Sequence, residues 1–322
     1  MRSREFTCLM QMLDVLTPRQ RNRMLGRLNA ERATDEVAVI IQSGLGKSVI
    51  CPRCKSTRTV RNGVASGLQR YKCRSCARTF NALTGTPLAR LRHRDKWLAQ
   101  AHVLDEGLSV RKAAARMQVH RTTAFRWRHR FLAVPCEVKA LGLDGVVEVD
   151  ETYVLRSFKG QRRRLALIGA PARKPRHRGG RARKRGLSAE QVAILIARNR
   201  SGRSTDSVLP IDNAACISEV LLQAVAADCV LCTDGAKQFE AAARTLGLQH
   251  QAVNIVRGER IRGAWHIQNV NAYHGRFKQW MQRFKGVATS YLPNYLGWFR
   301  ALDRNAQSGA APSSLLALAI RA

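Results

Sequence analysis

Two Cys-x-x-Cys pairs constrain this chain more than any other feature. The first pair is Cys51 and Cys54, the second is Cys73 and Cys76, and eighteen residues separate them. Each pair brings two thiolates to one turn, and four thiolates at this spacing are typical of a closed tetrahedral zinc site. Residues 48–82 include few apolar side chains, so a small domain there needs a metal to hold it together. The spacing predicts structural Zn²⁺ in a zinc ribbon, with a degenerate ribbon or an iron site as alternatives.

A further pair, Cys229 and Cys232, has no second pair to complete a metal site. It lies in an apolar run that has the character of a strand. Cysteine in such a position behaves as a small buried hydrophobe. We therefore expect core packing here rather than metal binding.

The chain is strongly basic. Its 322 residues include 56 Lys and Arg against 22 Asp and Glu, a formal net charge of +34. This excess indicates a polyanionic partner, for which nucleic acid is the leading candidate. No apolar run approaches the ~18 residues of a membrane span, and Glu5 and Asp14 interrupt the start of the chain where a secretory signal would be apolar. We expect an intracellular protein with no membrane partner.

Residues 156–185 form the most basic segment, with thirteen Lys or Arg and no Asp or Glu. Runs of like charge are often disordered and solvated. Contact with DNA phosphates is compatible with such disorder in the free protein. Arg162, Arg163 and Arg164 are the candidate DNA-binding residues of this insertion.

Residues 92–132 have the pattern of a basic helix-turn-helix. Gly107 and Ser109 interrupt the helical pattern, and a third helix is expected after Val119. The inward positions of the third helix are Ala124, Trp127 and Phe131, and the outward positions are Thr122, Arg126, His129 and Arg130. We expect the outward side, with Thr122, Arg126 and Arg130, to enter a major groove of DNA. The alternative is a three-helix core with a solvated basic face.

From Gly145 onward the apolar residues alternate, which indicates strands. The expected order is three strands followed by helix, strand, helix, strand and helix. The strands are expected near 147–150, 192–198, 207–210, 229–233 and 251–256, and the helices at 212–226, 236–246 and 267–284. This order predicts an α/β domain with a mixed sheet and flanking helices.

Two aspartates follow strand-like runs in a chain that is poor in carboxylates. Asp150 ends the run Val-Glu-Val-Asp, and Asp234 ends Val-Leu-Cys-Thr-Asp. Two aspartates at strand ends can share divalent cations, which permits two-metal phosphoryl chemistry. Either residue alone would be no more than a turn former.

The helix expected at 267–284 has two distinct faces. At 100° per residue, one narrow polar arc holds Asn271, His274, Gly275 and Lys278. The expected buried stripe holds Tyr273, Phe277, Trp280, Met281 and Phe284. The polar arc is able to present a ligand, a proton donor and a phosphate-binding ammonium to one site, although a solvated face gives the same pattern.

Together these parts resemble an insertion-sequence transposase of the zinc-ribbon type, and the resemblance covers almost the whole chain. It rests on the ribbon at 51–76, the helix-turn-helix at 92–132, Val-Asp-Glu-Thr-Tyr at 149–153, Thr-Asp-Gly at 233–235, and His-Ile-Gln-Asn-Val-Asn-Ala-Tyr-His-Gly-Arg-Phe-Lys at 266–278. The resemblance implies an RNase H-like catalytic domain with a DDE-type site. Members carry Asp, Asp and then Glu or a substitute such as Asn, followed seven residues later by Lys.

Asp150, Asp234, Asn271 and Lys278 match this pattern position by position, as the DDNK variant of the site. The resemblance implies that Asp150, Asp234 and Asn271 bind Mg²⁺ or Mn²⁺ and that Lys278 binds a DNA phosphate. An amide oxygen brings no charge to the metal, and Glu148, on the same strand face as Asp150, is a candidate to supply it.

Two histidines support this site in the resemblance. His274 is expected to donate a proton or to orient the amide of Asn271, and His266 with Asn269 matches the polar residues that lead into the helix.

The resemblance implies a transposase that binds the terminal inverted repeats of an insertion sequence and transfers the cut strand into target DNA. Its partners would be double-stranded DNA and further copies of the chain, in a bacterial cytoplasm at the nucleoid. The alternatives are a catalytically silent DNA-binding protein and a structure-selective nuclease. The expected parts are a helical region at 1–47, the ribbon at 48–82, the helix-turn-helix at 90–135, the catalytic domain at 144–302 and a tail at 303–322.

Overall fold

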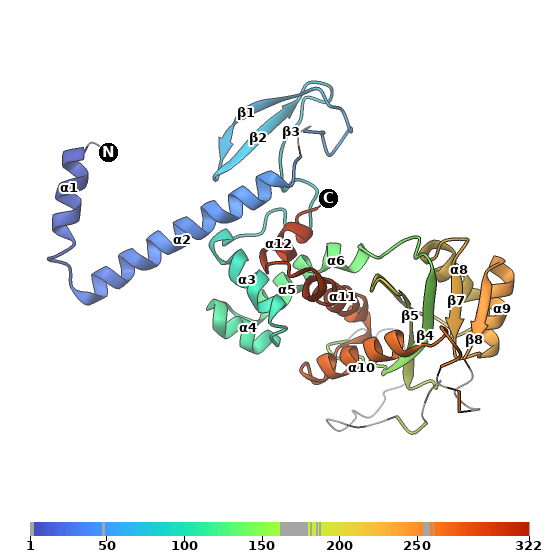
Figure 1. Cartoon of the computed structure of the whole chain (residues 1–322). Helices are drawn as coiled ribbons and strands as arrows, with labels where there is room; N and C mark the ends of the chain where they lie inside the picture. The colour runs from blue at the N-terminus through green and yellow to red at the C-terminus, as the bar shows by residue number, and fades with distance from the viewer. Residues whose placement is uncertain are drawn as a thin grey trace. The chain divides into compact units, whose positions relative to one another are not determined.

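The strand that carries Asp150 lies at the centre of a five-stranded sheet with the order β6-β5-β4-β7-β8 (Figure 1). The computed structural model describes residues 3–46, 49–161, 180, 182–184, 186, 188–253, 258–259 and 261–321. The strands of this sheet are β4 (Val146–Leu155), β5 (Gln191–Asn199), β6 (Ser204–Val208), β7 (Val230–Thr233) and β8 (Gln249–Ala252). Strands β4, β5 and β6 pair antiparallel, and β4, β7 and β8 pair parallel. The predicted mixed sheet is confirmed.

Helices cover both faces of this sheet because successive strand residues point to opposite sides. On one face, Val147 and Val149 join a core with Ile217 of α8 (Ala214–Ala224) and Phe239 of α9 (Lys237–Leu246). On the other face, α10 (Gln268–Gln282) lies against β4 and β5. Helix α11 (Leu292–Ser308) follows it after a short turn at Thr289–Tyr291. The fold is therefore a mixed sheet with flanking helices, as expected.

Three strands differ clearly from their expected bounds, and one of them is β8, which spans 249–252 rather than 251–256. Strand β4 continues past Asp150 to Leu155, because its pairing with β5 extends as far as Leu155 and Gln191. Strand β6 begins at Ser204 rather than at 207, because its pairing with β5 begins there. Asp234 does follow the last residue of β7, as predicted.

The four-cysteine segment forms a separate three-stranded antiparallel sheet. Its strands are β1 (Thr59–Ala65), β2 (Leu68–Cys73) and β3 (Thr79–Asn81). A small cluster of buried apolar side chains supports it, formed by Cys51, Cys73 and Phe80. The predicted ribbon thus forms around its cysteines rather than around a conventional core.

The amino-terminal region is helical, as predicted, with α1 (Ser3–Met12) and α2 (Pro18–Ser43). Thr17 caps α2: its hydroxyl accepts the backbone N–H of Gln20, and the Gln20 side chain accepts the backbone N–H of Thr17. With Pro18 in the first turn, this capping box fixes the start of the helix.

The helix-turn-helix forms where the sequence predicts it. Its helices are α3 (Trp97–Asp105), α4 (Val110–Met117) and α5 (Arg121–Phe131), and α3 is preceded by a 3-10 turn at Arg94–Lys96. The inward side chains of α5, Ala124, Trp127 and Phe131, are 2%, 4% and 1% exposed. The predicted core face of the third helix is therefore confirmed.

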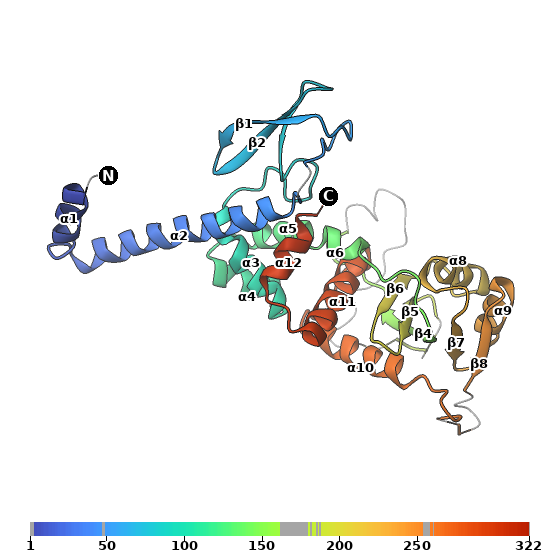
Figure 2. The ribbon, with the colours of Figure 1, turned by 45° about the horizontal axis from the view of Figure 1, so that its top comes forward.

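The described chain divides into two compact units. One holds residues 1–106, 110–131 and 312–322, and the other holds 107–109 and 132–311. The segment expected as a tail holds the end of α11 and a further helix, α12 (Ser313–Ala319), which contacts α3 and α5 in the first unit (Figure 2). The division into five parts stays a prediction.

Most of the basic insertion at 156–185, including Arg162, Arg163 and Arg164, lies outside the described residues. Every helix in the described part of the chain is too short or too polar to cross a membrane.

Candidate functional site

The register between β4 and β7 brings the two predicted aspartates together. These parallel strands pair Glu148 with Cys232. Two residues further along each chain, Asp150 comes level with Asp234, which directly follows β7. Neighbouring strands lie ~4.8 Å apart, so the two carboxylates lie close together where β7 ends beside β4.

The environment of Asp150 opposes its negative charge. Its side chain is 17% exposed. Burial, followed by the carboxylates of Glu151 and Asp234, raises the pKa of Asp150 to about 7, and the ammonium of Lys278 acts in the opposite direction. The four groups are therefore close enough to interact, although Asp150, Asp234 and Lys278 come from three different elements.

A second acidic group lies beside the aspartates. The hydroxyl of Tyr153 donates to Asp212 Oδ2 at 2.6 Å and to Glu151 Oε1 at 3.2 Å, and the Gln238 amide donates to the same Glu151 oxygen at 3.2 Å. Burial raises the pKa of Glu151 to about 7, and Asp212 and Asp234 add to the rise. The remaining oxygens, Glu151 Oε2 and Asp212 Oδ1, are buried and have no hydrogen-bond partner among the described residues.

Helix α10 presents the predicted arc, with one difference. Asn271, Gly275 and Lys278 are exposed, but His274 is only 6% exposed. Its Nδ1 lies 3.6 Å from Asp150 Oδ2. Burial lowers the pKa of His274 to about 4, and Lys278 contributes to the fall. A neutral imidazole therefore faces Asp150.

The predicted buried stripe of α10 is confirmed in part. Tyr273, Phe277 and Trp280 are 0%, 0% and 7% exposed, whereas Met281 and Phe284 are half-buried. The helix ends at Gln282, so these last two residues lie at its margin, where fewer neighbours cover them.

Glu148 lies beneath the first turn of α10 and is completely buried. Its Oε2 accepts the backbone N–H of Val270 at 2.9 Å, and its Oε1 accepts the Asn269 amide at 2.9 Å. Arg200 Nη1 lies 2.8 Å from the same Oε1. A carboxylate that caps a helix amino terminus is stabilised both by the free N–H groups and by the helix dipole. Glu148 thus joins β4 to the helix that carries Asn271.

His266 also contacts the Glu148 carboxylate that joins β4 to α10. Its Nδ1 lies 3.4 Å from Glu148 Oε1 and 3.0 Å from Arg200 Nη1, and it accepts the backbone N–H of Gln268 at 3.3 Å. His266 and Asn269 therefore contact the buried carboxylate directly rather than the aspartates.

The residues at the sheet edge fit divalent cations. Carboxylate and amide oxygens are the ligands that Mg²⁺ and Mn²⁺ prefer. Burial is the main cause of the raised pKa of Asp150, and the neighbouring carboxylates of Glu151 and Asp234 add to it, so the acidic side chains are gathered in a half-buried place. The two buried oxygens of Glu151 and Asp212 that lack a partner among the described residues add to this negative environment.

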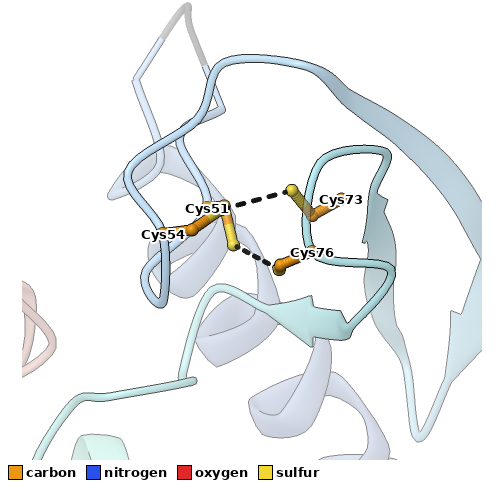
Figure 3. Close-up of side chains that lie close together, drawn as sticks. All are labelled: Cys51, Cys54, Cys73 and Cys76. Atoms are coloured by element: carbon orange, nitrogen blue, oxygen red, sulfur yellow. Dashed lines mark hydrogen bonds between the residues drawn. The ribbon is translucent and has the colours of Figure 1, made fainter.

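The four ribbon cysteines gather at one point (Figure 3). Their sulfur atoms all lie within 4.8 Å of one another, with 3.8 Å between Cys51 and Cys76 and 3.6 Å between Cys54 and Cys73. A tetrahedron with Zn–S bonds of ~2.3 Å has sulfur atoms ~3.8 Å apart. The spacing of the four thiols therefore fits Zn²⁺, as the sequence predicts.

The pKa values of the ribbon thiols are also shifted. Hydrogen bonds from backbone groups, led by Cys76, lower the pKa of Cys73 to about 6. At Cys54, a backbone hydrogen bond from Ser56 lowers the pKa, but burial and neighbouring thiols outweigh it and raise the pKa to about 12. A cation is required for all four sulfurs to be thiolates at once. By contrast, Cys229 and Cys232 are 1% and 0% exposed in the core of the sheet, as expected.

The outward side of α5 contains the candidate DNA-binding residues. Thr122, Arg126 and Arg130 are exposed, whereas His129 is half-buried against Phe125, with ring centroids 4.5 Å apart. The Arg130 guanidinium donates to the carbonyls of Pro87 and Ala89, the second at 2.6 Å. Arg130 therefore also holds the segment that enters the domain.

Sequence reasoning missed three groups at the site: Arg200, Glu151 and Asp212. Glu151 stands in the motif beside Asp150, and this adjacency was the one available signal. Asp212 and Arg200 lie far from the motifs in sequence and reach them only through the fold.

Known domain families match three parts of the chain. Residues 47–77 match the InsA N-terminal domain, residues 90–146 match a homeodomain-like domain, and residues 142–300 match the ISXO2-like transposase domain. A protein of the transposable element ISH50 from Halobacterium salinarum is 28% identical over 259 residues, which cover 78% of this chain and 84% of that protein. Residues 142–300 therefore match a transposase domain, they follow a match to the InsA N-terminal domain, and most of the chain is similar to a protein of a transposable element.

Proposed function

We propose that this protein cuts DNA at the terminal inverted repeats of an insertion sequence and joins the freed 3′ end to target DNA. The observation that carries the proposal is the proximity of Asp150 on β4 to Asp234, which directly follows the neighbouring parallel strand β7. Asp150, Asp234 and the amide oxygen of Asn271 would hold two Mg²⁺ or Mn²⁺ ions. When bound, such ions activate the attacking oxygen and neutralise the leaving oxygen of a phosphodiester.

The other residues of the site bind or position these groups. Lys278, exposed on the same helix as Asn271, would hold a DNA phosphate near the scissile bond. His274, neutral and 3.6 Å from Asp150, would orient that carboxylate. Glu148 and His266 would fix the start of α10, so that Asn271 faces the aspartates. The expected role of Glu148 as a source of missing charge is better suited to Glu151, whose Oε2 has no partner among the described residues.

The amino-terminal unit would hold the element's ends. Thr122 and Arg126 would contact the bases or phosphates of a major groove, and the zinc ribbon would add phosphate contacts through its arginines. Arg162, Arg163 and Arg164 of the insertion would contact phosphates as well. Because two ends must be joined, the protein would act as a homo-oligomer on DNA, at the bacterial nucleoid.

A strand-transfer assay tests this proposal. The protein is incubated with labelled DNA that carries the ends of its own element and with Mg²⁺ or Mn²⁺. We expect cleavage and joining by the native protein, and a loss of at least about 100-fold in Asp150→Asn and Asp234→Asn with DNA affinity retained. Activity that survives both substitutions would refute the mechanism.

The same assay separates the alternatives. Tight, salt-sensitive binding without cleavage by the native protein would identify a silent DNA-binding protein, which the neutral Asn271 favours. Cleavage of branched DNA without any requirement for the ends would identify a structure-selective nuclease.

A further inference from the structure

A positively charged cleft lies between the zinc ribbon and the segment that leads into α3. Its volume is about 750 Å³, and its walls come from β2, β3 and residues 90–95. The charged residues that line it are Arg70, Arg90, Arg92, Arg94 and Asp95. Four arginines thus face a single carboxylate, which makes the cleft a site for an anion.

The wall that holds three of these arginines has a defined shape. Arg90 and His93 adopt left-handed backbone conformations, with φ of 62° and 58°. Non-glycine residues adopt this region infrequently because it is strained, so the surrounding structure must hold them there. Trp97 Nε1 donates to the Arg92 carbonyl at 3.2 Å, and Lys96 Nζ donates to the Met117 carbonyl at 2.8 Å. These bonds fix the segment on the helix-turn-helix.

Arg94 supplies an unmet hydrogen-bond donor in the cleft. Its Nη2 donates to the carbonyl of Ser66, which ties the segment to the ribbon. Its Nη1 is buried, and no described residue accepts a hydrogen bond from it. A buried guanidinium nitrogen without an acceptor is costly, and an anionic oxygen in the cleft would satisfy it.

The cleft is tied to the helix that is expected to read DNA. Arg130 of α5 donates to the carbonyls of Pro87 and Ala89, and Arg90 follows directly. One side chain therefore connects the carboxyl end of α5 to the wall of the cleft. A duplex held by α5 would have its backbone presented at a fixed place relative to these arginines.

We infer that this cleft binds the sugar-phosphate backbone of duplex DNA, next to the bases that α5 contacts. The inference rests on the DNA binding included in the proposed function, but not on strand cleavage. Phosphate contacts of this kind carry affinity and salt dependence without carrying sequence information. Single-stranded DNA is a poorer candidate, because it is bound by stacking on exposed aromatic rings, and the only Phe, Tyr or Trp of the lining, Phe80, is 4% exposed.

The test measures duplex binding by the full-length Arg90→Gln/Arg92→Gln variant. Fluorescence anisotropy records its affinity for a duplex bearing the element's ends and for an unrelated duplex, over a range of salt concentrations. Each lost phosphate contact reduces the slope of log K against log salt by about 0.9, so we expect a slope smaller by about 2 and an affinity about 60-fold lower near 0.1 M salt. The affinity should fall equally on both duplexes.

The matched control is Arg19→Gln/Arg23→Gln, which removes two exposed charges from α2. We expect this control to stay within about 2-fold of the native protein. An unchanged slope in the cleft variant, an equal loss in the control, or a loss confined to the duplex that bears the element's ends would overturn the inference. Zinc content and melting temperature verify the fold, and Arg70→Gln on β2 gives a second, independent reading. Failure of strand transfer would not affect this result.

Discussion

Glu148 Oε2 accepts the backbone N–H of Val270 at 2.9 Å, beneath the first turn of α10. Glu148 precedes Asp150 by two residues on β4, and Val270 directly precedes Asn271 on the helix. One hydrogen bond therefore sets the distance between the strand and the helix of the candidate metal site. Arg200 balances the buried charge from 2.8 Å.

This relationship predicts the effect of Glu148→Gln. The change leaves the Arg200 guanidinium without its counter-charge and weakens the cap, so the free energy of unfolding should fall by about 2–3 kcal/mol. Amide hydrogen exchange in the first turn of α10 should accelerate, and strand cleavage should decline more than DNA affinity.

Asp206→Asn is the control for this change, because it also breaks a buried ion pair, with Arg300. It should cost similar stability and spare the exchange rates of the first turn of α10. Equal exchange in the two variants would show that Glu148 has no special role in placing the helix.

The zinc ribbon predicts one Zn²⁺ per chain. Cys51→Ser should release the metal and unfold the ribbon, because its small apolar cluster cannot replace the metal. Metal analysis of the purified protein measures this directly. Cys232 is a buried cysteine of the five-stranded sheet. The variant Cys232→Ser is the control and should retain the metal. Loss of zinc in the control alone would contradict the assignment.

The two arginines of α5 should behave differently. Arg126→Gln removes an exposed side chain and should reduce discrimination between the element's ends and unrelated DNA by about 1–3 kcal/mol if it reads a base. Arg130→Gln removes the contacts with Pro87 and Ala89 and should lower the melting temperature instead. Competition binding and thermal melting of both variants distinguish these roles. The reverse pattern would show that Arg130 is the reading residue.

The burial of His129 predicts that the stability of the helix-turn-helix depends on pH. Burial lowers the pKa of His129 to about 4, and Arg128 contributes. A depressed pKa means that the stability is present above the unfolded value of ~6.5 and is lost as the pH falls toward 4. Between pH 7 and 5 the loss attributable to His129, reduced for its partial exposure, is about 1 kcal/mol.

Denaturant unfolding of His129→Gln measures this term by difference from the native protein. The exposed His102 provides the control variant His102→Gln, which should keep the native pH dependence. An identical pH profile for His129→Gln and the native protein would contradict the prediction.

Local signals explain which features the sequence predicts correctly. Thr17 and Gln20 form a cap within four residues, the inward positions of α5 follow from helical spacing, and Asp234 follows a short apolar strand. Local sequence patterns do not predict contacts between residues that are distant in sequence. Asp212 meets Tyr153 across 59 residues and Arg130 meets Pro87 across 43, and no periodic pattern encodes either contact.

Helix α10 shows the same limit within one element. Its spacing places His274 correctly on the arc with Asn271 and Lys278, but it does not show that β4 covers His274 and leaves the other two exposed. The burial of Glu148 likewise depends on Arg200, which another strand end provides. The sequence pattern predicts which side chains share one face of a helix or strand. The element that packs against that face determines how deeply each of these side chains is buried and which groups it contacts.

The central claim is that Asp150 and Asp234 share a divalent cation, and thermal melting with and without Mn²⁺ tests it most directly. Because its charged form is opposed by burial and by Glu151 and Asp234, Asp150→Asn with its zinc retained should melt a few degrees above the native protein when no Mg²⁺ or Mn²⁺ is added. Mn²⁺ should raise the melting temperature of the native protein and leave that of Asp150→Asn unchanged. An equal response of both proteins to Mn²⁺ would contradict the claim.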